Sequence, residues 1–126
     1  MSLRVVSFDI LKGVPASLGA DYASSPIYLA YVGDYAIQLV FTGSPVGTFK
    51  LQASNDAATE IEGNSILSVN PLANWTDITG SDQAIAAAGN HMWNVSDTGY
   101  SFVRVVYTRT SGSGSLTSAR LYLKGA

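Results

Sequence analysis

Residues 35–54 read YAIQLVFTGSPVGTFKLQAS, and residues 100–124 read YSFVRVVYTRTSGSGSLTSARLYLK. In each stretch, apolar and polar side chains alternate on both sides of a glycine-containing turn. Strict alternation is typical of β-strands that bury one face, and two such strands around a short Gly-rich turn predict an antiparallel hairpin. The sequence therefore predicts two hairpins, which supply four main strands of an all-β domain.

The expected register of the first hairpin places Phe41 opposite Phe49 on the buried face and Gln38 near Gln52 on the exposed face. A slip of one residue would move the whole apolar set into water, so the alternation specifies the register strongly. Burial of each large apolar side chain stabilises the fold by roughly 1.5–3 kcal/mol.

The second hairpin, aligned about its own turn, buries Val105 against Leu121. Its other face then brings Arg104, Arg120 and Tyr122 together. Arginine and tyrosine are enriched at protein–protein interfaces, so these three residues form a candidate protein interface. The alternative is a solvated face on which the arginines stack and pair with acidic residues.

Shorter strands are expected at residues 3–10, 26–32, 75–78 and 91–95, with a weak one at 66–69 inside a polar loop that covers 55–70. Residues 81–88 fit a helix or a short strand. The total is about eight strands without a firmly predicted helix. This pattern predicts an all-β fold, an antiparallel two-sheet sandwich of jelly-roll or Greek-key type, as a single domain over residues 1–126.

Composition excludes several classes of function. Of the 126 residues only 13% are charged, and the formal net charge is -2, so no basic surface is expected for nucleic acid. Cysteine is absent, which excludes disulfides and thiolate metal sites and fits assembly in the cytosol. Residues 1–10 do not resemble a signal peptide, and no apolar run is long enough for a membrane span.

No residue pattern indicates catalysis, so the chain is expected not to be an enzyme and to need no cofactor or metal. His91 is the only histidine, and no nucleophile and orienting group accompany it in a recognisable arrangement. Asp56, Glu60 and Glu62 form the only acidic cluster. They fit a solvated loop, with a weak calcium site as the alternative.

Aromatic residues near the predicted loops suggest a second class of function. Trp75, Trp93 and Tyr100, if exposed in a row, would form a platform on which sugar rings stack, as in a carbohydrate-binding module of a phage tail or a bacterial surface protein. The competing interpretation is burial in the core, the usual fate of a strand tryptophan.

Three segments carry a family resemblance: GSPVGTFKLQASND (43–56), NWTDI (74–78) and GYSFVRVVYTRTSGSGSLTSARLYLKG (99–125). In this order they resemble a family of small all-β virion proteins of tailed bacteriophages. The resemblance covers about residues 35–125, with a gap over 57–72, and contains no active-site motif. It implies a structural protein of the virion, assembled in the host cytoplasm.

Within that family, the leading expectation is a capsid decoration or cement protein. Its partners would be capsid or other virion proteins, and it would form a homo-oligomer, a dimer or trimer matched to a local symmetry axis. Neither nucleic acid nor a membrane is an expected partner.

Overall fold

A computed structural model describes residues 4–29, 33–62, 65–96 and 98–125. Its described residues form strands, turns and loops, and no helix among them is long and apolar enough to span a membrane. The strands are β1 (Arg4–Asp9), β2 (Ala16–Ser17), β3 (Tyr22–Ala23), β4 (Ile27–Tyr28), β5 (Asp34–Gly43), β6 (Val46–Ser54), β7 (Ala58–Glu62), β8 (Ser65–Val69), β9 (Thr76–Asp77), β10 (Gln83–Ile85), β11 (Gly89–Val95), β12 (Phe102–Ser111) and β13 (Gly114–Gly125).

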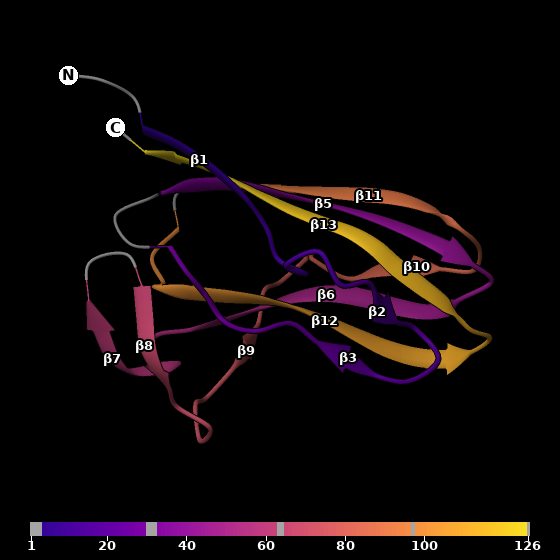
Figure 1. The fold of residues 1–126 in the computed structure, drawn as a ribbon, viewed down its shortest axis with the longest axis horizontal. Coiled ribbons are helices and arrows are strands. Elements are labelled where there is room, and N and C mark those ends of the chain that lie inside the picture. Colours follow the sequence, from indigo (N-terminus) through magenta and orange to yellow (C-terminus); the bar gives the residue numbers. More distant parts are fainter. Residues whose placement is uncertain (1–3, 30–32, 63–64, 97, 126) are drawn as a thin grey trace.

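Two antiparallel sheets face each other (Figure 1). Sheet A has the strand order β1-β13-β5-β11, with β2 beside β13. Sheet B has the order β10-β6-β12-β3, with β4 beside β12 and β9 beside β6. Along the described strands the chain changes from one main sheet to the other between β2 and β3, β4 and β5, β5 and β6, β10 and β11, β11 and β12, and β12 and β13. This alternation is the topology of a jelly roll and confirms the predicted sandwich.

The two predicted hairpins are wrong in their pairing, although the strands are where the sequence places them. β5 pairs with β13, so that Ile37 lies opposite Leu121, whereas β6 pairs with β12, so that Leu51 lies opposite Val105. Each expected hairpin partner lies in the other sheet, across the core. An inward-facing strand alternates in the same way in both arrangements, so the pattern of side chains does not distinguish a hairpin from a crossing between sheets.

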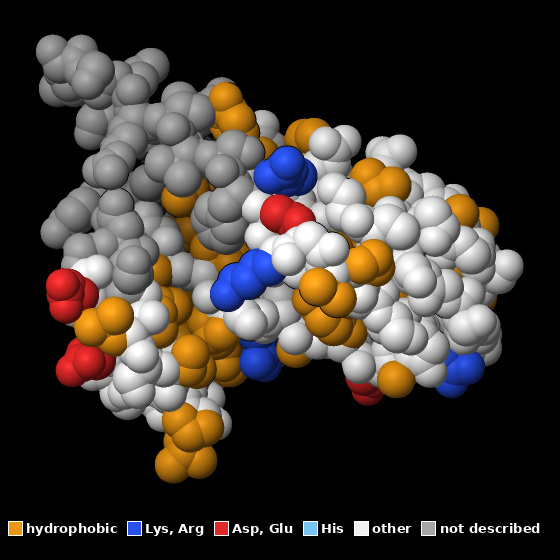
Figure 2. Space-filling model, in the orientation of Figure 1, with side chains coloured by type: hydrophobic (Ala, Val, Ile, Leu, Met, Phe, Trp, Pro, Cys, Tyr) orange, Lys and Arg blue, Asp and Glu red, His pale blue; other side chains and the backbone are white. Residues whose placement is uncertain are grey.

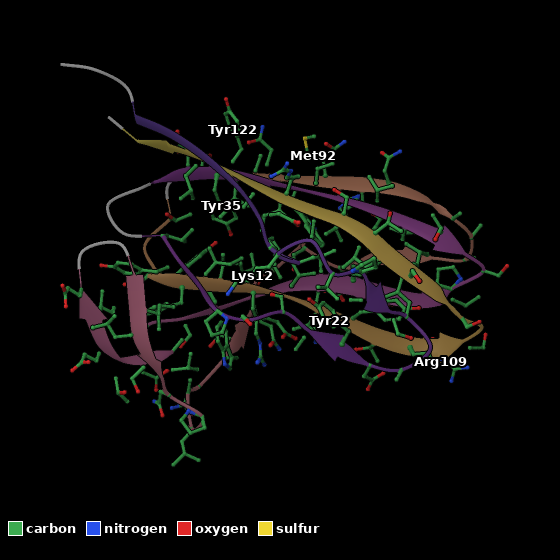
Figure 3. All side chains as sticks on the ribbon, in the orientation of Figure 1. Lys12, Tyr22, Tyr35, Met92, Arg109 and Tyr122 are labelled. Atoms are coloured by element: carbon green, nitrogen blue, oxygen red, sulfur yellow. The ribbon has the colours of Figure 1, made fainter. Side chains whose placement is uncertain are left out.

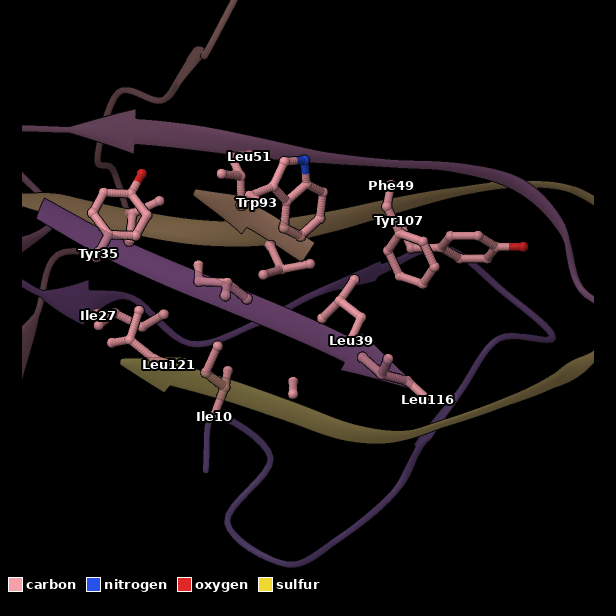
Figure 4. Packing of buried hydrophobic residues seen from close by; sticks show 14 of the residues in the cluster. Ile10, Ile27, Tyr35, Leu39, Phe49, Leu51, Trp93, Tyr107, Leu116 and Leu121 are labelled. Carbon is pink, nitrogen blue, oxygen red and sulfur yellow. The ribbon is translucent and has the colours of Figure 1, made fainter. Parts of the chain in front are cut away.

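The inner faces of the two sheets form one continuous core (Figure 4). The ring centroids of Phe41 and Phe49 are 5.5 Å apart, and those of Phe49 and Tyr107 are 4.7 Å apart. Phe41 belongs to sheet A and the other two rings to sheet B, so these contacts join the layers. The four long central strands contribute Tyr35, Ile37, Leu39, Phe41, Phe49, Leu51, Val103, Val105, Tyr107, Leu116, Ala119, Leu121 and Leu123, all buried.

The region expected to be a polar loop, residues 55–70, contains a separate two-stranded hairpin instead. β7 and β8 pair with each other, with irregular register near Glu60, and with neither main sheet. The weak strand expected at 66–69 is therefore confirmed, and its partner β7 is new. Residues 81–88, which fit a helix or a strand, contain the short strand β10.

The two crossings β5–β6 and β12–β13 lie against each other at one end of the sandwich. The Ser44 backbone N–H donates to the carbonyl of Ser113 at 2.8 Å. Gly112 adopts a positive φ of 71°, and a Cβ atom there would collide with the Ser44 carbonyl oxygen. Glycine is therefore required at 112 for two reasons, its left-handed conformation and its close neighbour.

We predict that Gly112→Ala lowers the free energy of unfolding by about 2–5 kcal/mol, because left-handed strain and overpacking add together. Gly80→Ala is the matched control, since Gly80 has a φ of 82° but no atom within 4 Å of an added Cβ. It is expected to cost about 1–2 kcal/mol from strain alone. Urea unfolding of both variants measures the difference, and equal losses would contradict the close approach of the two crossings.

Candidate functional site

The outer face of sheet A carries an ordered array of side chains. In one row across three strands, Arg120 of β13 lies opposite Gln38 of β5, which lies opposite Met92 of β11. In the next row, Tyr122 and Asn94 flank Ala36 in the same way. Neighbouring strands are about 4.8 Å apart and the rows about 7 Å apart, so the array occupies one compact area of the sheet.

A hollow of about 460 Å³ lies over this array and extends along β5 to Asp34. Its floor is low because Ala36 is small and stands between the larger Tyr122 and Asn94. Figure 3 shows Tyr122 and Met92 pointing away from the sheet, whereas Tyr35 of the same region points between the layers. Tyr122 is 45% exposed and Met92 54%, so both present apolar surface to solvent.

Three polar side chains that line the hollow have no polar partner among the described residues. The side chains of Gln38, Asn94 and Arg120 make no hydrogen bond or ion pair with other described residues. Asp9 lies opposite Arg120 in the register, but its carboxylate accepts the backbone N–H groups of Leu11 at 3.1 Å and Gly13 at 2.8 Å.

The predicted interface of Arg104, Arg120 and Tyr122 is divided between the two sheets. Arg120 and Tyr122 line the hollow on sheet A, whereas Arg104 lies on the outer face of sheet B. The expectation that all three share a face is wrong because β12 and β13 are not hairpin partners. The expected proximity of Gln38 and Gln52 is also wrong, because β5 and β6 lie in different sheets.

On sheet B, Arg104 belongs to a network of polar side chains that bond to one another. Its Nε atom donates to Gln52 at 2.9 Å, and the guanidinium lies 4.3 Å from the ring centroid of Trp75. Gln52 in turn donates to Asp77 at 2.8 Å, and Lys50 pairs with Asp77 at 3.0 Å. Hydrogen bonds from Gln52 and Lys50 lower the pKa of Asp77.

The proposed stacking residues do not form a row. Trp93 is buried and donates its indole N–H to the Ser81 carbonyl at 2.8 Å. Trp75 lies half-buried under Arg104 on sheet B, and Tyr100 hydrogen-bonds Tyr35 through their hydroxyl groups at 2.6 Å.

His91 packs edge-on against Trp93, with ring centroids 4.8 Å apart, and burial lowers its pKa. A histidine held in this way favours the neutral imidazole. Within the described ranges, no three histidine or acidic side chains are grouped closely enough to hold a metal ion.

A second hollow, of about 540 Å³, lies at the end of the sandwich beside Asp56, but its polar groups are mostly occupied. Asp56 accepts the Ser54 hydroxyl at 2.7 Å and both the backbone N–H and the side-chain amide of Asn74 at 2.9 Å. These bonds lower the pKa of Asp56. The acidic cluster expected from the sequence is therefore divided. Asp56 holds the loop by its hydrogen bonds to Ser54 and Asn74, whereas Glu60 and Glu62 are exposed on β7.

The β7–β8 hairpin and the turn after it present apolar side chains to solvent. Figure 2 shows them gathered at the lower left, over β7 and β8. The exposed members are Ile61, Leu67, Val69 and Leu72, of which Leu72 is 83% exposed. We call these four residues the apolar hairpin patch.

Sequence analysis missed most residues of both surfaces. Alternation placed Gln38 on an outer face, but it gave no indication that β11 is the neighbour of β5, so Met92 and Asn94 were not grouped with it. The apolar hairpin patch lies among polar residues in the sequence, where isolated apolar side chains give no periodic signal.

We predict that Asp56→Asn lowers the free energy of unfolding at pH 7, because the amide cannot accept all the bonds of the carboxylate. The pKa of Asp56 is depressed below its ordinary 3.8, so its stabilisation is present above that pH and is lost as the pH falls through the lowered pKa. Denaturant titrations at several pH values should show the wild-type advantage shrinking below about pH 4. The control is Asp82→Asn, an exposed carboxylate that makes no hydrogen bond to other described residues; a similar pH-dependent loss there would contradict the assignment.

Comparisons with known proteins give a fold but no family. No protein-family model matches the chain, and no curated protein matches it. The SPBc2 prophage-derived protein YomS has a similar structure, with a TM-score of 0.56 over 99% of this chain and 96% of that one, at 11% sequence identity. A family two carbohydrate esterase from Cellvibrio japonicus aligns with 99% of this chain and 35% of its own length at 12% identity, but the TM-score of 0.27 is too low to support an argument. The likeness to YomS shows a shared fold.

Proposed function

We propose that this chain is a structural protein of a bacteriophage virion, a decoration or cement protein that acts through protein–protein contacts. The jelly-roll fold shared with a prophage-derived protein, over nearly the full length of both chains, supports a phage origin. The resemblance of residues 35–125 to small virion proteins agrees with it. Jelly rolls are also a common architecture of viral capsid proteins.

The apolar hairpin patch is the observation that carries the proposal. Small soluble proteins seldom expose several large aliphatic side chains together, and such patches mark interaction sites. Here Ile61, Leu67, Val69 and Leu72 project from a hairpin that pairs with neither main sheet, with Glu60 and Glu62 beside them. A hairpin of this kind can insert into a neighbouring subunit without disturbing the sandwich.

Such contacts stabilise a shell by mass action. A protein that binds only the assembled lattice lowers the free energy of that lattice and so opposes its dissociation. Repetition on a symmetric lattice favours a dimer or trimer on a local axis. The rigid sandwich would then act as a spacer between hairpin contacts.

The test is to purify particles from the host that encodes the chain and to identify their proteins by mass spectrometry. We expect the wild-type chain in the particles and at least tenfold less of Leu67→Asp, because a buried charge in an apolar contact costs more than about 1.4 kcal/mol. Leu67 is 53% exposed, so the isolated variant should fold normally.

Val14→Asp is the matched control, since Val14 is 69% exposed and lies in the connection between β1 and β2, not on the hairpin. It should be incorporated like the wild type. Absence of the wild-type chain from purified particles would overturn the proposal, and equal incorporation of both variants would exclude the hairpin as the contact.

A further inference from the structure

We propose that the free edge of strand β11 is a pairing surface for a second copy of this chain, so that two copies join their sheets A across a two-fold axis. The inference specifies the symmetric homo-oligomer and rests on that part of the proposed function alone. It depends neither on the apolar hairpin patch nor on the presence of the chain in a virion.

β11 is the last strand of sheet A and has a neighbouring strand on one side only (Figure 1). Its seven residues pair with β5 without a break in register, from Gly89 opposite Phe41 to Val95 opposite Tyr35. Within the described part of the chain, the main chain of β11 makes hydrogen bonds only to β5. Alternate N–H and carbonyl groups along its outer side are therefore open to a further strand.

The other edges of the two main sheets are interrupted. On sheet A the opposite edge is divided between β1 and the two-residue β2. On sheet B one edge consists of β9 and β10 and the other of β3 and β4, and none of these four strands exceeds three residues. Short edge strands are a usual protection against pairing with another chain. Among the described strands, only β11 forms a whole edge of a main sheet as one continuous strand.

β11 also lacks the residues that usually prevent edge pairing. Residues 83–96 contain no Lys, Arg, Asp, Glu or Pro, and the pairing of β11 with β5 shows no bulge. Burial lowers the pKa of His91, which keeps this strand uncharged at pH 7. The preceding loop contains three exposed alanines at 86–88, so no large side chain of that loop holds two copies apart.

The outward side chains of β11 are symmetric about Met92, and this selects a second copy as the partner. In an antiparallel pair centred on Met92, the two thioethers meet, and Asn90 of each copy lies opposite Asn94 of the other. Met92 is 54% exposed, and both asparagines are exposed. Two facing amides can each donate to and accept from the other. A pair centred on residue 91 or 93 would instead place an amide opposite the Met92 thioether.

The inward side chains fit the same register. Gly89 of one copy then lies opposite Val95 of the other, so the residue without a side chain leaves room for the branched one. His91 lies opposite Trp93. His91 and Val95 are half-buried at the rim of the core, and pairing covers the remainder of both side chains. Burial of this rim adds to the backbone hydrogen bonds that a shared strand pair supplies.

The experiment measures the mass of the purified chain by analytical ultracentrifugation, over a concentration series up to about 1 mM, the weak end of specific association. We expect an equilibrium between monomer and dimer. Met92→Lys should weaken the dimer by about tenfold or more, because it places two positive charges opposite each other. Val40→Lys is the matched control, since Val40 is 38% exposed on the same face but lies on β5, opposite Asn90. It should dimerise like the wild type.

Cysteine variants test the register, because the chain has no cysteine of its own. Met92→Cys should be linked to itself by a short bis-maleimide. Asn90→Cys alone and Asn94→Cys alone should not be linked, because the two copies of either residue would lie about 14 Å apart along the strands. An equal mixture of these two variants should be linked.

A chain that remains a monomer throughout the series would overturn the inference, as would a dimer that Met92→Lys leaves intact. Equal loss of the dimer in Met92→Lys and Val40→Lys would also contradict it, since this result indicates stacking of the outer faces. Linkage of Asn90→Cys to itself but not of Met92→Cys would exclude the register.

Circular dichroism spectra of each variant separate lost association from lost folding. The measurements use the isolated chain, so a failure of edge pairing leaves the proposed lattice contact of the hairpin untouched. Absence of the chain from purified particles would equally leave the dimer in solution unaffected.

Discussion

Contact between the inner faces of the two sheets is the constraint on which the structure depends. Phe41 reaches from sheet A to Phe49 of sheet B, which packs on Tyr107 in turn. Neither sheet could bury its apolar face alone, because the chain has no helix among its described residues to cover it. The stability of the domain therefore comes mainly from apolar area removed between the layers.

This arrangement leaves the outer faces free for function. Once the inward positions of β5, β12 and β13 are committed to the core, the alternate positions must face outwards. On sheet B these outward side chains bind one another, in the network of Arg104, Gln52 and Asp77. On sheet A, Gln38, Asn94 and Arg120 make no hydrogen bond to other described residues and surround the small Ala36, where the hollow lies.

The apolar hairpin patch lies outside the two main sheets, on strands that pair only with each other and on the turn after them. β7 and β8 are tied to the sandwich at their base, where the Asn70 side chain donates to the Asp56 carbonyl at 2.8 Å and Asp56 binds Asn74. The hairpin itself packs little apolar surface against the core, as its exposed Leu67 and Val69 show. The apolar hairpin patch is therefore structurally separate from the outer face of sheet A.

The sequence by itself determined the four long strands, their buried faces and the all-β class, because alternation is a local property that each of these strands carries alone. It identified Phe41, Phe49, Val105 and Leu121 as core residues for that reason. Only the tertiary structure decided which strands are neighbours, since a glycine turn serves a hairpin and a crossing between sheets equally well. That choice moved Arg104 away from Tyr122 and brought Gln38, Met92 and Asn94 together, so the sites depend on pairing between distant segments that no local pattern records.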